Sequence, residues 1–546
     1  MKNEKNMNKY KNKIGIGLLM AAVGFGAVGC DKFLGSEPYS FTSTENFYKT
    51  ADEAEIALAG CYEALHGGNN LFGRNLLFIL NGGTDECITR AGISNNVTPF
   101  GLAAVSSSAA PLKAVWEGFY AGINRTNHLI AKIDAIEMGE SRKEQIKAEA
   151  RFLRGLYHYY LTMMFGAIPI KTEPDPEAGP RQSVQEVYEQ IISDFQHAYE
   201  ILPDRARIQG AANKWSAAGY LAKVGAYLGS AKVSGMGNEL NFELNSFGWV
   251  DAEEAYQLVV DMTTAIIQEG GYDLTERYDF LFRETTRDAQ YEECLFTIEA
   301  SSATANGTYN RYSDWVPFGP ASIGGGTTRW MCPLAETFDR YHANDVRRAH
   351  NMARNITVNS AVEEIGGYRY YQPTVATTPD QGYLSATKYR QRDAAQKPIP
   401  QWASDGLMPL LRYADILLLR AEALYYFDDE PEARNLLAEV RVRAVREGSM
   451  VETLNTSYHR VDFMEELLDE RSRELCFESH RRFDLARFNK YTEAITSLQS
   501  TRGLHNVAVP DLQANWHPYR IWFPIPLAEM DLNAELKPQN PGYGAE

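Results

Sequence analysis

The segment LLRYADILLLRAEALYYF, residues 410–427, predicts a buried helix around which neighbouring helices pack. Its apolar and small residues recur every three or four positions, which is the period of one helix face: Leu411, Ala414, Leu418, Ala421 and Tyr425. Ala414 and Ala421 stand two turns apart on that face, so a second helix can approach closely there. Arg412 and Asp415 are three residues apart and are expected to pair along the same helix.

Several other stretches have the same helical period, and one long region lacks it. Helices are expected from a cap at Thr50 or Asp52 to about residue 65, and at 114–136, 143–165, 184–202, 215–233, 251–268, 431–447 and 461–488. Small residues on one face of 215–233 again favour close packing. The dense arginines and glutamates of 465–487 indicate a salt-bridged helix, and Glu439 with Arg443 a surface pair. Residues 67–99 read as a polar loop. In residues 270–406 glycine, threonine, serine and aromatic residues replace the helical pattern, which favours short strands and pinned loops.

Composition places the chain among soluble globular proteins. The 546 residues are 44% hydrophobic and 23% charged, and the formal net charge is -17. So acidic a body argues against binding of nucleic acid or anionic lipid through a basic patch. Aromatic residues make up 12%, with 31 tyrosines the largest share. Tyrosine has an apolar ring and a polar tip, which suits a polar but partly apolar ligand such as a sugar.

The amino end predicts export. Five lysines precede an apolar run, residues 14–28, which is too short to span a bilayer comfortably, and small residues and Cys30 follow it. Residues 1–29 are therefore expected to be a signal peptide. A cysteine directly after such a segment resembles a bacterial lipobox, in which the thiol carries lipid and anchors the chain. An ordinary secretory peptide with an incidental cysteine is the alternative.

Motifs for other chemistry are missing from the sequence. The remaining cysteines stand singly, without a CxxC pair, and are expected to be buried structural residues: Cys61, Cys87, Cys294, Cys332 and Cys476. The sequence contains no HExxH, no GxSxG and no Gly-Lys-Ser/Thr phosphate loop. We therefore expect neither a metal site nor a cofactor.

Two groups of residues are candidates for ligand contact. Asp85, Glu86 and Arg90 lie in the polar loop 67–99, and polar side chains on long ordered loops often bind ligands. Tyr312, Trp315 and Trp330 lie in 271–406 and are the candidate platform on which the C–H face of a sugar ring would rest. A solvated loop is the alternative for the first group, and anchoring of the loop in the core is the alternative for the second.

Several separated motifs, in order along the chain, resemble one family. They are CDKFL (30–34), WEGFYAGINRTNHLI (116–130), AEARFLRGLYHYYLTMMFGAIPI (148–170), LLRYADILLLRAEAL (410–424), ELLDERSRELCFESHRRFDLARF (466–488) and FPIPLAEMDLNAELKPQNPGY (523–543). Together they resemble the RagB/SusD outer-membrane lipoproteins. The resemblance implies a mainly α SusD-like fold, in which tetratricopeptide-like helix pairs support a loop-rich face with a few short strands. It also implies a lipid at Cys30, and Asp85 falls where many members place an acidic binding residue.

The resemblance further implies function and organisation. Members bind oligosaccharide or polysaccharide at the cell surface without catalysis, and pass it to a SusC-like TonB-dependent transporter in the outer membrane. The expected regions are 30–270, an N-terminal helical part, and 271–546, a C-terminal part. The latter comprises a ligand face (271–406), helices (411–495) and a strap (505–546).

Two other classes of protein stay open. One is an exported glycoside hydrolase, which needs two carboxylates flanking the scissile bond, one with a raised pKa. The other is a helical-repeat scaffold that binds proteins, or a component of peptide uptake. An exposed surface of aromatic rings with polar partners favours sugar, whereas a continuous apolar groove favours peptide.

Overall fold

The computed structural model describes residues 47–68, 70–89, 96–301, 330–354, 362–365, 367–371, 376–381, 383–389 and 405–544. The contacts within the chain divide it into two units, Met1–Lys49 and Thr50–Glu546, and the described helices and strands belong to the second. The expected signal peptide and four of the candidate residues lie outside the described residues: Cys30, Arg90, Tyr312 and Trp315.

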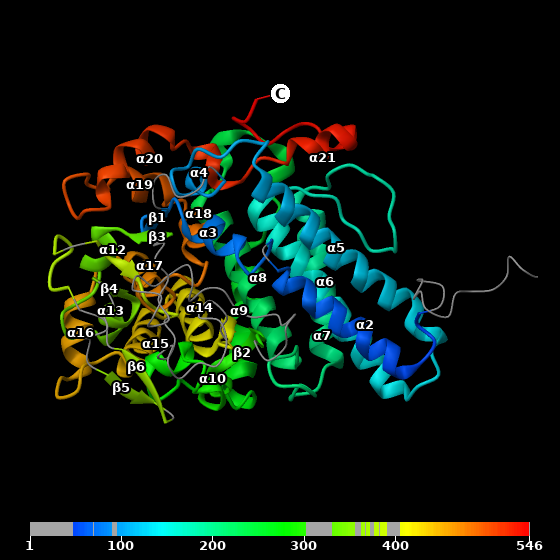
Figure 1. Ribbon diagram of the computed structural model, residues 1–546, viewed down its shortest axis with the longest axis horizontal. Helices are drawn as coiled ribbons and strands as arrows, with labels where there is room; N and C mark the ends of the chain where they lie inside the picture. The colour runs from blue at the N-terminus through cyan, green and yellow to red at the C-terminus, as the bar shows by residue number, and fades with distance from the viewer. Residues whose placement is uncertain are drawn as a thin grey trace, which may run out of the picture. The chain divides into compact units, whose positions relative to one another are not determined.

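The second unit is mainly helical, as the sequence predicts (Figure 1). Its longer helices are α2 (Ala51–His66), α5 (Ala110–Lys132), α6 (Glu140–Phe165), α7 (Val184–Ile201), α8 (Lys214–Ser234), α9 (Ala252–Glu269), α14 (Tyr413–Tyr426), α15 (Glu430–Val442) and α17 (Phe463–Glu474). The shorter ones are α3 (Asn75–Asn81), α4 (Thr98–Gly101), α10 (Arg287–Glu293), α12 (Ala335–Asp339), α13 (Val346–Asn351), α16 (Val451–Tyr458), α18 (Arg481–Arg487), α19 (Tyr491–Thr496), α20 (Val509–Asn515) and α21 (Leu527–Leu532).

The strands are short and pair two by two. They are β1 (Cys87–Thr89), β2 (Cys294–Ile298), β3 (Met331–Pro333), β4 (Met352–Ala353), β5 (Val362–Ile365), β6 (Tyr368–Tyr371), β7 (Ser385–Ala386) and β8 (Met408–Arg412). The pairs β1–β3, β2–β8, β4–β7 and β5–β6 are all antiparallel. Most of these strands fall in residues 270–406, so the expectation of short strands in that region is confirmed for its described part.

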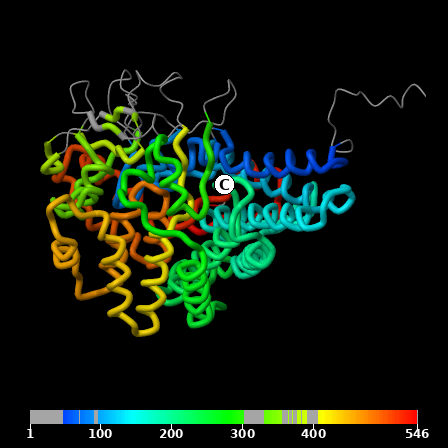
Figure 2. Tube along the Cα trace, turned by 90° about the horizontal axis from the view of Figure 1, so that it is seen from below, coloured from blue at the N-terminus to red at the C-terminus, as the bar shows by residue number. Residues whose placement is uncertain are grey.

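Consecutive long helices pack against one another, which is the arrangement of helix-pair proteins. Contacts join α2 to α5, α5 to α6, α6 to α7, α7 to α8, α8 to α9, and α14 to α15. Figure 2 shows the helices from α2 to α9 following one another from blue to green, with the yellow and orange helices beside them. Helix α14 also contacts α8, α9 and α17, so the segment that opens the sequence analysis joins the two helical groups.

Small residues make the closest of these contacts possible. A Cβ added at Gly225 of α8 would lie 2.6 Å from the carbonyl oxygen of Ala255 on α9. One added at Gly229 would lie 2.8 Å from the ring of Tyr256. Real Cβ atoms do not approach other atoms so closely, so glycine is required where α8 crosses α9. The predicted close packing of this helix is confirmed, and Ala414 and Ala421 of α14 are likewise fully buried.

Local signals at the helix ends are also confirmed. Thr50 caps α2 in a reciprocal capping box with Glu53, and Gly166 ends α6. The carboxyl-terminal strap is ordered, because the N–H of Phe523 donates to the carbonyl of Met164 over 2.8 Å. Arg181 donates to Asn540 over 2.6 Å, and this bond ties the strap to the segment that follows α6.

None of the helices in the described residues is long and apolar enough to cross a bilayer.

Five predictions were wrong where contacts distant in sequence decide the structure. The loop 67–99 contains α3 and β1, and residues 410–412 belong to strand β8, because Leu411 pairs with Phe296 of β2. Arg412 does not pair with Asp415, which binds Lys223 and Arg471 instead. The predicted helix over 461–488 is broken into α17 and α18 by left-handed backbone at Phe477 and Ser479. The predicted surface pair of Glu439 and Arg443 is replaced by buried pairs of Arg443 with Glu293 and Glu474.

Candidate ligand face and the ion-pair network behind it

Strands β1 and β3 bring the two groups of candidate residues together. Asp85 and Glu86 directly precede β1, and Trp330 directly precedes β3. The strands are antiparallel, with Thr89 opposite Met331, so the end of one strand lies beside the start of the other. Asp85 and Glu86 therefore lie at one end of this small ladder and Trp330 lies at the other, although they come from opposite halves of the chain.

Asp85 is bound by its own chain. It is only 3% exposed, and Arg481 donates to its carboxylate from Nε and Nη2 over 2.8 and 2.6 Å. Arg340 forms a further ion pair with it. Burial alone would raise the pKa of Asp85, but the two guanidiniums outweigh burial and lower it to about 2. Asp85 is thus an ionised internal partner of two arginines, and its expected contact with a ligand stays a prediction.

Glu86 is buried beside it. Ser472 Oγ donates to the carboxylate over 2.8 Å, and burial raises the pKa of Glu86 to about 7 despite the nearby arginines. The carbonyl of Glu86 accepts hydrogen bonds from the N–H of Leu334 and the hydroxyl of Thr337. Glu86 therefore fastens β1 to α12 and α17, and like Asp85 it has a structural role.

Trp330 is also an anchor. The residue is 9% exposed, its ring lies 5.1 Å from that of Phe78, centroid to centroid, and the Arg74 guanidinium lies 5.1 Å from its ring. Because these neighbours cover the ring, it offers a sugar little surface, and anchoring in the core is the interpretation that the structure supports.

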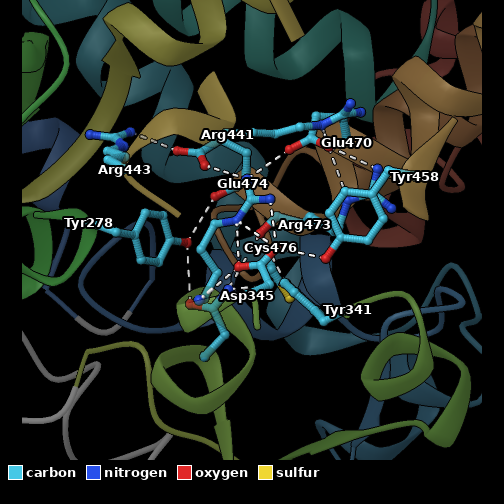
Figure 3. Close-up of polar contacts among 12 residues, drawn as sticks. Tyr278, Tyr341, Asp345, Arg441, Arg443, Tyr458, Glu470, Arg473, Glu474 and Cys476 are labelled. Atoms are coloured by element: carbon cyan, nitrogen blue, oxygen red, sulfur yellow. Dashed lines mark hydrogen bonds and ion pairs between the residues drawn. The ribbon is translucent and has the colours of Figure 1, made fainter. Parts of the chain in front are cut away.

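A buried ion-pair network surrounds α17, the helix whose Ser472 donates to Glu86 (Figure 3). At one end, Arg347 pairs with Asp345 over 2.7 Å, with Glu470 over 2.7 Å and with Glu474 over 2.8 Å, and all four side chains are inaccessible to solvent. The network continues through Arg412, Arg441, Arg443 and Arg473, which pair with glutamates of α10, α17 and the segment after α17. Burial opposes ionisation, but the guanidiniums lower the pKa values of Glu470 and Glu474.

Tyrosines of the loop-rich region extend the network. Tyr278 and Tyr341 donate to the carbonyls of Glu474 and Arg473, each over 3.0 Å. The Arg473 guanidinium lies 3.7 Å from the ring centroid of Tyr458, whose hydroxyl donates to Asp345 over 2.8 Å. The network thus fixes the described part of residues 271–406 to the helices. Sequence reasoning took the charges of α17 for a salt-bridged helix surface, because their partners lie far away in the sequence.

A cleft of about 340 Å³ lies elsewhere, between α2, residues 207–211 and the end of β2. Leu58, Ile208 and Ile298 form apolar walls. Arg142 bridges two carboxylates at the cleft, with distances of 2.8 Å to Glu55 and 2.9 Å to Glu149. Mostly apolar walls with a few fixed polar groups are the usual form of a small-molecule site. Its residues come from four separate segments, so no sequence motif predicts it.

The cysteines and the acidic residues add no further site. Cys61, Cys87, Cys294, Cys332 and Cys476 are buried thiols, which confirms the prediction of structural cysteines. Within the part of the chain that the structure describes, no three His, Cys, Asp or Glu side chains are grouped so as to hold a metal ion.

Comparison with known proteins identifies the family. The model of the SusD family matches residues 269–543, and a model described as "Starch-binding associating with outer membrane" matches residues 86–228. The SusD-like protein P2 of Formosa agariphila is 26% identical over 98% of this chain and 100% of its own length. The starch-binding protein SusD of Bacteroides thetaiotaomicron is 25% identical over 84% of each chain.

Solved structures agree on the fold. The crystal structure of a SusD homologue from Bacteroides thetaiotaomicron superposes with a TM-score of 0.70 at 22% identity, covering 91% of this chain and 98% of that one. A laminarin-binding SusD-like protein superposes with a TM-score of 0.66 at 23% identity, covering 91% of this chain and 100% of its own. The family model spans half of the sequence, and the fold is SusD-like throughout the superposed part. The chain belongs to the SusD family.

Proposed function

We propose that this protein is a non-catalytic, cell-surface glycan-binding lipoprotein, which captures oligosaccharide or polysaccharide and delivers it to a SusC-like TonB-dependent transporter in the outer membrane. The observation that carries the proposal is the similarity along nearly the whole chain to SusD-like proteins. One of these relatives is named for starch binding, and a structural neighbour is named for laminarin binding. The second family model is described by association with the outer membrane.

The proposed anchor is lipid on the thiol of Cys30, after removal of residues 1–29. The lysine-rich start and the apolar run ahead of Cys30 support it. Several acyl chains on one residue hold a protein firmly to a membrane, whereas one chain holds it weakly. We expect the full chain to incorporate labelled palmitate and to sediment with outer membranes, and Cys30→Ser to do neither. Equal labelling of both forms would contradict the anchor.

The absence of catalysis is proposed from the state of the carboxyl groups. Asp85 and Glu86 have pKa values of about 2 and about 7, a separation that an acid and a nucleophile would need. Both are buried, however, and both are hydrogen-bonded to the protein's own chain. A glycosidic bond therefore has no access to them. We expect no release of reducing ends from any polysaccharide that the protein binds.

The glycan is proposed to bind at Arg90, Tyr312 and Trp315, which lie outside the described part of the chain. Arg90 directly follows β1 in sequence, and Tyr312 and Trp315 lie in the segment between β2 and β3. The test is calorimetry of the chain lacking residues 1–30 against a panel of neutral and charged polysaccharides. For a polysaccharide that binds, Tyr312→Ala and Trp315→Ala should weaken binding. The failure of every polysaccharide to bind would refute the function, whereas unchanged affinity in both variants would refute only these contacts.

Delivery to a transporter is proposed from the family alone and has its own test. The acylated chain, purified from outer membranes in mild detergent, is expected to bring with it a TonB-dependent transporter in comparable amount. Recovery of the chain without such a transporter, also after crosslinking in intact cells, would contradict this step.

A further inference from the structure

One aromatic ring stands out on the surface of the loop-rich region. Among the tyrosine, phenylalanine and tryptophan residues whose side chains the structure describes, Tyr383 is 47% exposed and Phe427 is 36% exposed, and the others are less exposed. The imidazoles of His459 and His517 are exposed as well. Phe427 ends a helix, α14, and its ring packs against that of Tyr426. Tyr383 lies in the segment before β7, and its ring lies 5.1 Å from the His505 ring, centroid to centroid, at an angle of 46°.

The loop that carries Tyr383 and the loop that carries His505 are hydrogen-bonded to each other. His505 Nε2 donates to the carbonyl oxygen of Leu384 over 2.7 Å. The N–H of Gly503 donates to Asp380 Oδ1 over 2.8 Å. Each loop therefore holds the other immediately beside the rings. The relative placement of Tyr383 and His505 is fixed by backbone groups as well as by the side chains themselves.

The 499–507 loop is in turn fixed to helix α12. The side chain of Asn506 accepts from the N–H of Ala335 over 3.1 Å and donates to Glu336 over 2.8 Å. Glu336 also accepts from the N–H of Gln499 over 2.9 Å. A surface held in this way loses little conformational freedom when a ligand binds, which favours recognition by a preformed site.

The location also fits ligand binding. Strand β7 pairs with β4, and it contacts β3, the strand that follows Trp330. The exposed ring of Tyr383 therefore belongs to the same group of short strands as the candidate ligand face. Trp330 is buried there as an anchor, whereas Tyr383 is exposed.

The chemistry around the rings suits a sugar. A pyranose presents C–H bonds on its flat face, which rest on an aromatic ring whose face is negative, and hydroxyl groups around its edge. Asp380 and Arg502 lie on the same two loops. Asp380 accepts from the N–H of Gly503 through one carboxylate oxygen, and Arg502 pairs with Asp339, so the polar atoms that these bonds do not use are the ones available to such hydroxyls. Leu504, exposed beside His505, adds apolar surface. A single exposed tyrosine is ordinary on protein surfaces. Here the ring is fixed, adjoins a second ring and has polar groups nearby.

We propose that Tyr383 and His505 form a stacking platform for one pyranose ring of the bound glycan. This inference rests on the proposed glycan-binding function and names a contact within it. Neither Tyr383 nor His505 is among the aromatic residues expected from the sequence to stack on sugar, which are Tyr312, Trp315 and Trp330.

The test uses three variants of the chain lacking residues 1–30, titrated with a polysaccharide that the unmodified chain binds. Tyr383→Ala should weaken binding about 3- to 10-fold, in proportion to the loss of one ring contact. Tyr383→Phe keeps the ring and should stay within about 2-fold of the unmodified chain. Phe427→Ala removes the other exposed ring, in the helical part, and should leave the affinity unchanged. All three should fold, with unfolding temperatures within a few degrees of that of the unmodified chain, because both rings are partly exposed.

The outcomes separate the two proposals. If the unmodified chain binds no polysaccharide, the function itself fails, and the platform with it. If it binds and Tyr383→Ala binds equally well, or if Phe427→Ala weakens binding as much, the function stands and the platform is refuted.

Hydroxyl-radical footprinting gives a direct readout of contact. Oxidation of Tyr383 should fall when the polysaccharide is bound, and oxidation of Phe427 should not change. Tyr383 that is oxidised equally with and without glycan would overturn the platform even if the alanine variant bound weakly.

Discussion

Replacement of Arg347 by methionine should reveal how much the buried ion-pair network stabilises the protein. Methionine keeps most of the length of the side chain and removes the charge. Asp345, Glu470 and Glu474 each lose a partner at 2.7 to 2.8 Å in a region without access to water. Glu470 and Glu474 retain other arginines, whereas Asp345 loses its ion pair with Arg347 and retains the hydrogen bond from Tyr458. Loss of one partner from a buried network costs about 3 to 5 kcal/mol, because a buried charge is left without compensation.

The assay is urea unfolding of the chain lacking residues 1–30 at pH 7, followed by circular dichroism. Arg460→Met is the matched control, because the Arg460 side chain is 56% exposed and pairs with Asp469 over 2.9 Å. An exposed pair contributes less than about 1 kcal/mol. We expect a large fall in the urea midpoint for Arg347→Met and almost none for Arg460→Met. If the two variants unfold at the same urea concentration, the network does not stabilise the fold and the reasoning is refuted.

The remaining predictions concern acid, packing and thiols. The pKa of Glu474 is lowered in the folded protein, so the ionised carboxylate stabilises the fold above the unfolded-state pKa of about 4.3, and this stabilisation is lost as the pH falls below that value. The urea midpoint should therefore drop steeply below about pH 4. A midpoint that does not change with pH would contradict the lowered pKa. Gly225→Ala should destabilise by about 1 to 3 kcal/mol because its Cβ meets α9, whereas Gly60→Ala in open space on α2 should stabilise by up to about 1 kcal/mol; thermal unfolding of both variants decides. Burial raises the pKa of the Cys61 thiol to about 12, and the other four described cysteines are buried too, so a thiol reagent should modify none of the five in the native chain lacking residues 1–30 and all five in urea.

The sequence predicted the helices well because their signals are local. The period of α6 and α7, the capping box at Thr50 and the terminating Gly166 all lie within a few residues of the feature that they specify. The glycines of α8 were read correctly as a seam for a second helix. These inferences need only the geometry of one helix and the size of its side chains.

The strand that precedes α14 was missed for the opposite reason. Leu411 fits the helical period of the residues after it, but its backbone pairs with Phe296, more than a hundred residues earlier. Arg412 was likewise assigned to the nearest carboxylate, whereas its partners include Glu293 and Glu478. A periodic pattern contains no information about which distant strand or charge competes for a residue.

The candidate site shows the same limit. Asp85 and Glu86 looked like ligand contacts because they lie in a polar stretch of a long loop. Arg340 and Arg481 neutralise Asp85 from 255 and 396 residues away, and the fold buries both acidic residues. Tyr383 was not singled out, because one tyrosine among 31 has no distinguishing pattern until the structure shows which rings are exposed.

The central claim is that this SusD-family chain binds glycan and does not cut it. The most direct test is one set of calorimetric titrations of the chain lacking residues 1–30 against a polysaccharide panel, with reducing ends assayed in the same cells afterwards. The account predicts saturable heat with at least one polysaccharide and no new reducing ends. Heat with none of them, or binding accompanied by release of reducing ends, would contradict it.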